Sequence, residues 1–321
     1  MNGAVATTPV AVVSLCSPPR AAHLRNQLAA LGGHADVERI VVWIDDDDSP
    51  SLDADRILRV DRGPAGLRLA SARNAGAAAA IANGAALIVF LDADCVPGPD
   101  LLDRYRAAAV DHPDAVLAGP VTYLSSGFDV SNRPALRRAT APHAARPNPP
   151  DHTTQIAADE EYPLFWSLSF AVSASTWVRT GGFHEAYEGY GGEDTDFAFT
   201  LRSQGIPLVW VGGAHAYHQY HPTSSPPWQH LDDILRNGAR FAQRWGEWPM
   251  TGWLRAFAEE GAVEWDGSSW RRSGVDCAVS ARSASADRAT RGLPEQPVSR
   301  SDQRARDRIR SEVADARERT L

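Results

Sequence analysis

Short apolar runs and longer helix-like segments alternate from Val10 to about Gly119, and this alternation limits the possible folds more than any other sequence feature. Apolar runs of strand length cover residues 10–15, 40–44 and 86–91. Between them, residues 21–31 and 67–82 have the spacing and alanine content of helices. Strands separated by helices in this way form a mainly parallel sheet with helices on its faces. We therefore expect an α/β fold.

The rest of the chain divides into three segments of different composition. Residues 125–160 are dense in proline and polar side chains, which predicts a long irregular loop that could act as a lid. Residues 161–270 hold most of the tryptophans and are expected to form a second packed half. Residues 271–321 contain no aromatic residue and are rich in charge, so we expect a polar tail that is disordered or helical.

The charged residues exclude several classes of function. Arginine and lysine total 32 against 40 acidic residues, for a net charge of -8, so the chain has no general attraction for a nucleic-acid backbone. Every basic residue is an arginine, which excludes Schiff-base chemistry and a P-loop. The absence of lysine and the abundance of alanine also favour a high-GC bacterial source. We expect no nucleic-acid partner.

The three cysteines, Cys16, Cys95 and Cys277, are odd in number and lack the spacing of a metal site. This pattern favours a reducing compartment, and we expect a cytoplasmic location. The most apolar stretch is interrupted by Asn83 and Gly84, so we expect no transmembrane segment. Peripheral docking on a membrane surface stays open.

Two carboxylates directly follow the apolar run at 86–91. Ligands of open parallel sheets gather at the carboxyl ends of strands, so Asp92 and Asp94 are expected at the reactive edge. Residues i and i+2 of a strand face the same side, and carboxylate oxygens suit Mg²⁺ or Mn²⁺. The pair therefore predicts a divalent cation site. The structural alternative is that both residues cap the turn before a helix near Pro99.

A second group of acids follows a glycine-rich stretch that begins at Gly181. Phe197 and Leu201 lie one helical turn apart, which places Glu193, Asp194 and Asp196 in the first turn of an amphipathic helix. Exposed amides and the helix dipole favour carboxylates there, and such a carboxylate can accept a proton from a bound hydroxyl. Plain helix capping is the alternative interpretation.

Three histidines follow at three-residue intervals: His215, His218 and His221. In an extended segment, residues three apart face opposite sides, so His218 should point away from the other two. A three-histidine zinc site is therefore disfavoured, and at most one face of the segment reaches a metal. A structural role for each histidine stays open.

The order of these motifs resembles a known family. A strand-ending Asp-x-Asp, a Gly-Gly-Phe…Gly-Gly-Glu-Asp segment and a later histidine are similar to the A-type (GT-A) nucleotide-sugar glycosyltransferases. The resemblance is greatest to glycosyltransferase family 2 and to a galactosyltransferase-like C-terminal module, and it covers residues 10–222. It implies a Rossmann-like, mainly parallel sheet flanked by helices. It further implies metal-dependent transfer of a sugar from a UDP- or GDP-sugar to an acceptor hydroxyl, with inversion.

The resemblance also implies roles for the two halves and for the metal ligands. Residues 1–124 would bind the nucleotide sugar, and residues 161–270 would hold the acceptor and the catalytic groups. Asp94 matches a direct ligand of Mn²⁺ or Mg²⁺, and Asp92 matches a contact to ribose or metal. His218, 25 positions after Glu193 as in polypeptide N-acetylgalactosaminyltransferases, matches the third ligand, with His215 and His221 as alternatives.

Further roles follow from the same resemblance. Asp194 matches the residue that takes the acceptor proton, and the neighbouring Glu193 would hold a sugar. Arg20 and Arg73 would approach the nucleotide and its phosphates. Asp45 would contact the base or ribose, and Asp46 in the same acidic run is an alternative for this role.

Two features leave alternatives open. Tyr190 stands where the galactosyltransferase motif has tryptophan, so the acceptor preference of that motif does not carry over. The string around Asp92 also resembles the nucleophile motif of haloacid-dehalogenase-type phosphatases, although its position in the chain and the lack of lysine argue against that class. Besides a glycosyltransferase and a phosphatase, a protein that binds nucleotide sugars without catalysis is the third function that the sequence leaves open.

Overall fold

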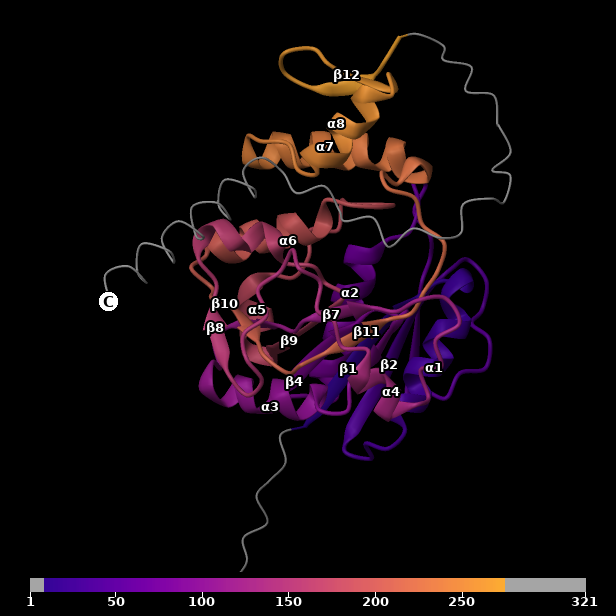
Figure 1. Cartoon of the computed structure of the whole chain (residues 1–321), viewed down its shortest axis with the longest axis vertical. Helices are drawn as coiled ribbons and strands as arrows, with labels where there is room; N and C mark the ends of the chain where they lie inside the picture. The colour runs from indigo at the N-terminus through magenta and orange to yellow at the C-terminus, as the bar shows by residue number, and fades with distance from the viewer. Residues whose placement is uncertain (1–8, 275–321) are drawn as a thin grey trace, which may run out of the picture. The chain divides into compact units, whose positions relative to one another are not determined.

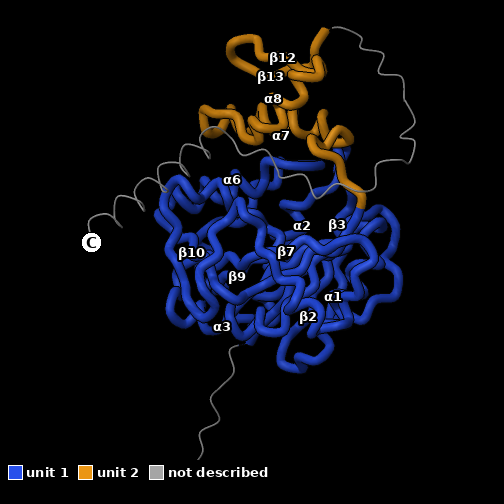
Figure 2. The backbone as a smooth tube through the Cα atoms, viewed as in Figure 1, with its two compact units in different colours: residues 1–221 blue, residues 222–321 orange. Residues whose placement is uncertain are grey.

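The computed structural model describes residues 9–274. The chain forms two compact units that divide between His221 and Pro222, coloured separately in Figure 2. The boundaries expected near residues 124 and 160 fall inside unit 1. In the described part of the chain, no helix is long and apolar enough to span a bilayer.

Unit 1 is built on an eight-stranded sheet that is mainly parallel (Figure 1). Its strands are, in spatial order, β3 (Arg56–Val60), β2 (Val37–Ile44), β1 (Val10–Cys16), β4 (Leu87–Leu91), β9 (Ser169–Ser173), β6 (Val116–Ala118), β10 (Leu208–Val211) and β8 (Thr154–Ile156). Strand β9 runs antiparallel to both neighbours, and β8 is an antiparallel edge strand. The predicted α/β class is confirmed.

Helices cover both faces of this sheet. They are α1 (Ala21–Leu31), α2 (Leu69–Ala82), α3 (Leu101–Asp111), α5 (Ala174–Thr180) and α6 (Glu193–Ser203), with 3-10 turns η1 (Pro18–Arg20) and η2 (Asp159–Leu164). Helix α4 (Arg133–Arg138) packs instead through Leu136 with Val96 and Tyr217. Val13 belongs to the core cluster that includes residues of α2, α5 and α6, whereas Val12 belongs to the cluster on α3. Alternate residues of one strand therefore enter two cores, which is why every residue of β1 is buried.

A small three-stranded sheet lies at the edge where the candidate residues gather. Strand β11 (Ala216–His218) pairs in the middle, parallel to β7 (Val121–Tyr123) and antiparallel to β5 (Cys95–Pro97). In this register His218 is opposite Cys95. The sheet therefore brings the histidine segment beside the Asp-x-Asp turn.

Unit 2 contains helical and strand elements of its own. They are η3 (Trp228–His230), α7 (Leu231–Trp245), α8 (Thr251–Glu259), β12 (Val263–Trp265) and β13 (Trp270–Arg272). Helix α7 buries an apolar stripe that includes Leu231, Ile234 and Phe241.

Three expectations about secondary structure need correction. Strand β3 was not anticipated because Arg56–Val60 is short and partly exposed. Residues 125–160 are not wholly irregular, since they contain α4 and the edge strand β8. The expected polar tail begins inside β13, and its remainder from residue 275 lies outside the described residues.

Candidate active site

The Asp92–Asp94 turn is held in place by a buried glutamine of α1. Strand β4 ends at Leu91, and the chain then turns, with the backbone N–H of Cys95 donating to the carbonyl of Asp92 at 2.8 Å. The side chain of Gln27, which is 0% exposed, donates from Nε2 to the carbonyls of Asp92 (2.6 Å) and Cys95 (2.8 Å). Ser14 Oγ donates to Gln27 Oε1 at 2.5 Å. The sequence analysis missed Gln27, because a polar residue on a helix gives no local signal of such a role.

The end of β11 is fixed against this turn. The backbone N–H of Gln219 donates to the carbonyl of Asp94 at 2.7 Å, directly after the His218–Cys95 pair. Tyr123 of β7 packs on the His218 ring with 4.6 Å between centroids. The imidazole of His218 is therefore held between an aromatic ring and the acidic turn.

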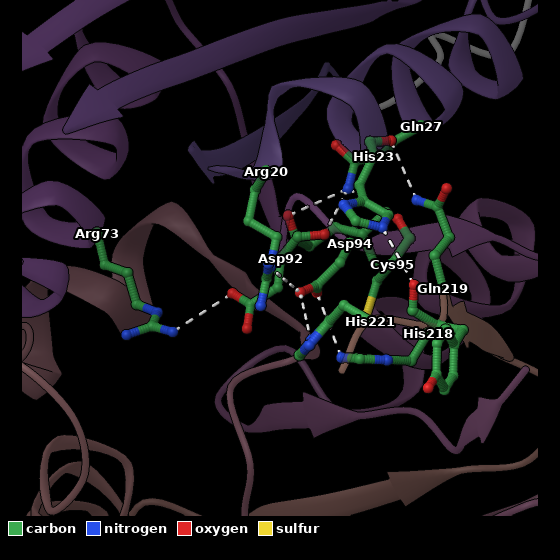
Figure 3. A network of polar contacts seen from close by, with 12 residues as sticks. Arg20, His23, Gln27, Arg73, Asp92, Asp94, Cys95, His218, Gln219 and His221 are labelled. Carbon is green, nitrogen blue, oxygen red and sulfur yellow. Dashed lines mark hydrogen bonds and ion pairs between the residues drawn. The ribbon is translucent and has the colours of Figure 1, made fainter. Parts of the chain in front are cut away.

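Asp94, His218 and His221 form one cluster, which we call the Asp94 cluster. One ligand atom from each residue lies within 4.8 Å of the others. The Nε2 atoms of His218 and His221 are 3.5 and 3.4 Å from the two carboxylate oxygens of Asp94, as Figure 3 shows. The expectation that His218 points away from His221 is wrong, because β11 ends at His218 and the alternation of a strand does not continue to His221. His215 lies outside the cluster.

The donor atoms of the Asp94 cluster fit a divalent cation. Burial lowers the pKa of His218, so its ring is neutral and can offer a lone pair at neutral pH. Burial disfavours the charge on Asp94, but the hydrogen bond from His221 and the nearby His218 and Arg20 together hold the pKa of Asp94 below its usual range. Arg20 Nε donates to Asp94 Oδ2 at 3.0 Å. A carboxylate with two imidazoles suits Mn²⁺ better than Mg²⁺, which prefers oxygen ligands.

A buried arginine of α2 collects the remaining acids into what we call the Arg73 cluster. Arg73 is 3% exposed, and its guanidinium nitrogens lie 3.4 Å from Asp92, 3.6 Å from Glu193 and 3.9 Å from Asp194. The guanidinium also stacks on Phe183, 5.0 Å from the ring centroid. Three carboxylates share this one cation, and each of them lies near the others.

The two acids of the Asp-x-Asp motif therefore separate. Figure 3 shows Asp92 directed toward Arg73, whereas Asp94 meets the histidines. The expectation that both face the same side assumed a continuing strand, but the turn after Leu91 rotates them apart. Burial raises the pKa of Asp92 to about 7, partly offset by Arg73.

The start of α6 presents the acids as predicted. Gly191 and Gly192 adopt positive φ angles of 87° and 93°, and the helix begins at Glu193. Asp194 Oδ2 accepts a hydrogen bond from the Ser167 amide at 3.0 Å, while its buried Oδ1 has no hydrogen-bond partner among the described residues. Burial and the adjacent charge of Asp194 raise the pKa of Glu193 to about 7. Asp194 Oδ1 thus accepts no hydrogen bond among the described residues, although Arg73 Nη1 lies 3.9 Å from it.

The acidic run after β2 forms a separate turn. Asp45 Oδ1 accepts from the Asp47 amide at 3.2 Å, and Asp46 Oδ1 accepts from the Arg62 amide at 3.1 Å. Neither residue contacts the Asp94 or Arg73 cluster in the interactions that the described chain makes. Their predicted nucleotide contact stays a prediction.

A cavity of about 220 Å³ lies beside the Asp94 cluster. Its lining includes His23, Asn26, Phe128, Gln219 and Tyr220. The His23 ring is 6.2 Å from that of His221, so the cavity adjoins the histidine side of the cluster. Its lining mixes polar and aromatic side chains.

Comparison with protein families gives two matches that overlap along unit 1. Residues 51–161 match glycosyl transferase family 2. Residues 152–222 match the N-terminal domain of galactosyltransferase. The second match includes both α6 and the Asp94-cluster histidines.

Two curated relatives are similar in sequence. Validoxylamine A glucosyltransferases of Streptomyces hygroscopicus subsp. jinggangensis (strain 5008) and subsp. limoneus are each 30% identical in alignments of 241 positions that cover 65% of this chain. The chain spans 55% and 51% of their respective lengths.

Solved structures are similar in fold. GalNAc-T7 with UDP, GalNAc and Mn²⁺ is 14% identical with a TM-score of 0.52, covering 80% of this chain and 52% of that one. S. aureus TarS 1–349 in complex with UDP-GlcNAc is 12% identical with a TM-score of 0.51, covering 73% and 66%. At these identities the likeness shows the fold.

Proposed function

Because the chain belongs to glycosyltransferase family 2 and has the A-type glycosyltransferase fold, we propose that it transfers a sugar from a nucleoside-diphosphate donor to an acceptor hydroxyl. The donor class is a UDP- or GDP-sugar, and the transfer inverts the anomeric centre. The observation that carries the proposal is the meeting of the Asp94 cluster and the Arg73 cluster at one edge of the sheet.

Asp194 is the proposed general base. Its Oδ1 is a buried carboxylate oxygen with no hydrogen-bond partner among the described residues, and the Ser167 amide orients the group through Oδ2. It would take the proton of the acceptor hydroxyl as that oxygen bonds to the anomeric carbon. The bond from this carbon to the donor diphosphate breaks in the same step, and its electron pair leaves with the diphosphate. Glu193 beside it would hold a sugar hydroxyl.

Asp94, His218 and His221 would hold Mn²⁺ or Mg²⁺, with His221 joining the ligands that the sequence predicts. A bound cation would supply positive charge against the diphosphate. His221, His218 and Arg20 together would keep Asp94 ionised, and Arg20 would orient it through its 3.0 Å contact. Asp92 and Arg73 would act chiefly by fixing the acids of α6 in place. We also propose a cytoplasmic location, in keeping with the free buried thiols of Cys16 and Cys95.

The first experiment screens UDP- and GDP-sugars, with UDP-glucose first because the relatives are named glucosyltransferases. The readout is thermal stabilisation with Mn²⁺ and with EDTA, since a ligand at 100 times its Kd adds about 2.7 kcal/mol. Metal-dependent stabilisation by one donor is expected. Stabilisation that is equal in EDTA would contradict the metal assignment.

The second experiment separates binding from chemistry. Asp94→Asn should lose the metal-dependent stabilisation, whereas Asp194→Asn should keep it and lose about 10²- to 10⁴-fold in donor turnover, measured with validoxylamine A and with water as acceptors. Asp103→Asn, a surface change on α3, is the matched control and should behave as wild type. Donor binding without any turnover in wild type would favour the non-catalytic alternative.

A further inference from the structure

Arg146 is a buried cation that the proposed reaction has not used. The residue is 6% exposed, and Nε, Nη1 and Nη2 have no hydrogen-bond partner within residues 9–274. Its guanidinium lies over Trp166 and Trp210, 5.2 Å from each ring centroid. Burial lowers its pKa to about 10, so it stays charged at neutral pH. Two indole faces compensate only in part for desolvating a cation.

Contacts link Arg146 to both parts of the candidate site. The His143 ring meets Trp166 at 5.1 Å and Tyr123 at 5.7 Å, and Tyr123 packs on His218 of the Asp94 cluster. On the other side, Trp166 is followed by Ser167, whose amide holds the carboxylate of Asp194. Against the effect of burial, the nearby Tyr105, Tyr123 and Asp194 each raise the pKa of the guanidinium, with Tyr105 the largest of these three.

The other two arginines of the site already have anionic partners. Arg20 donates to Asp94, and Arg73 is shared by three carboxylates. Arg146 has donors but no acceptor among the described residues. A guanidinium matches two oxygens of a phosphate in a bidentate contact, and such contacts are strong where water is excluded.

We propose that Arg146 binds the diphosphate of the donor, and that Trp166 and Trp210 hold its guanidinium in the orientation for this contact. The inference rests on the proposed function for the identity of the anion. It makes Arg146 a catalytic residue that would neutralise charge on the leaving group as the bond to the sugar breaks.

The two possible roles of Arg146 predict opposite effects on stability. An arginine kept to bind a ligand is an unpaired buried charge in the free protein, so an apolar residue of similar length should be tolerated or stabilising. An arginine kept to support the fold should destabilise the protein when it is replaced. Arg146→Met tests this difference directly, and Arg146→Lys keeps the charge while removing the fork.

The experiment measures calorimetric Kd values for UDP and for inorganic pyrophosphate, both with Mn²⁺, together with the melting temperature of the ligand-free protein. Arg146→Met is expected to raise the Kd values of both anions at least about tenfold. Its melting temperature is expected to be unchanged or higher than that of wild type. The Kd values of Arg146→Lys should lie between those of Arg146→Met and wild type. Arg202→Met is the matched control, because Arg202 stacks on Phe199 at 4.1 Å and lies on α6 away from these contacts. It should bind as wild type does.

Equal Kd values for wild type and both Arg146 variants would overturn the inference and leave the proposed function standing. Wild type that binds pyrophosphate through Arg146 but turns over no nucleotide sugar would contradict the proposed function alone. Wild type that binds neither UDP nor pyrophosphate would overturn both. If Arg146→Met does not fold, the Kd values of Arg146→Lys decide between these outcomes.

Discussion

Replacing Gln27 with leucine should weaken both the fold and the binding of a cation. The buried amide donates to the carbonyls of Asp92 and Cys95 at 2.6 and 2.8 Å and accepts from Ser14 at 2.5 Å. Each hydrogen bond contributes about 1 kcal/mol net, so the loss of three should lower the free energy of unfolding by roughly 3 kcal/mol. For a protein of this size that corresponds to about 6–12 °C in Tm.

The effect on the cation follows from the position of the amide. Gln27 contacts no atom of the Asp94 cluster directly but fixes the turn that carries Asp94. Residues that orient metal ligands in this way are typically worth about 10- to 100-fold in metal affinity. The assay pairs thermal unfolding by circular dichroism with calorimetric titration of Mn²⁺.

Gln204→Leu is the control for Gln27→Leu, because Gln204 is exposed and makes a single long bond of 3.4 Å to the Thr180 carbonyl. It should change the free energy of unfolding by less than about 0.5 kcal/mol. Mn²⁺ affinity that stays at the wild-type value in Gln27→Leu would refute the reasoning, even if the Tm falls.

Two further predictions concern stability. Burial raises the pKa of Glu193 from 4.5 to about 7, so the folded chain holds this proton more tightly than the unfolded chain and loses stability as pH rises between those values. The free energy of unfolding of Glu193→Gln, relative to that of wild type, should therefore rise from pH 5 to pH 8 by about 1 kcal/mol or more, measured by urea unfolding. A difference that does not change with pH would contradict this prediction. Gly76→Ala should cost about 1–2 kcal/mol although alanine favours helices, because the added Cβ would overlap Val13 and lie 3.1 Å from Val42. Gly33→Ala, which meets no atom within 4 Å, should be neutral or slightly stabilising in the same assay.

Hydrophobic periodicity and helix-start residues were enough to predict several helices and strands. Helix α1 has the predicted bounds, 21–31, and α6 begins at Glu193, where glycines give way to acids and an apolar stripe. Strand β2 begins at Val37, before the predicted start at residue 40. Polar, partly buried residues near its start interrupt the apolar pattern from which the strand was predicted. Local periodicity thus found these elements, whereas the buried strands β6 and β9 were not predicted.

The geometry of the site depended on contacts that no local pattern contains. Extending the strand rule past Leu91 and past His218 gave wrong side-chain directions, because both strands end at those residues. The partners of Gln27 and of Arg73 come from other elements, and only the sheet order brings them together. The resemblance to a family pointed to His218, which the structure places beside Asp94, whereas periodicity alone did not.

The pairing of β5 with β11 also has a consequence for protein synthesis. Asp94 leaves the ribosome long before His218 and His221, so a nascent chain that ends between them has the acid without the histidines of the Asp94 cluster. Contacts between distant parts of a chain form late in folding. Binding of a divalent ion at the proposed cation site would therefore report that residues 9–221 have reached their native topology.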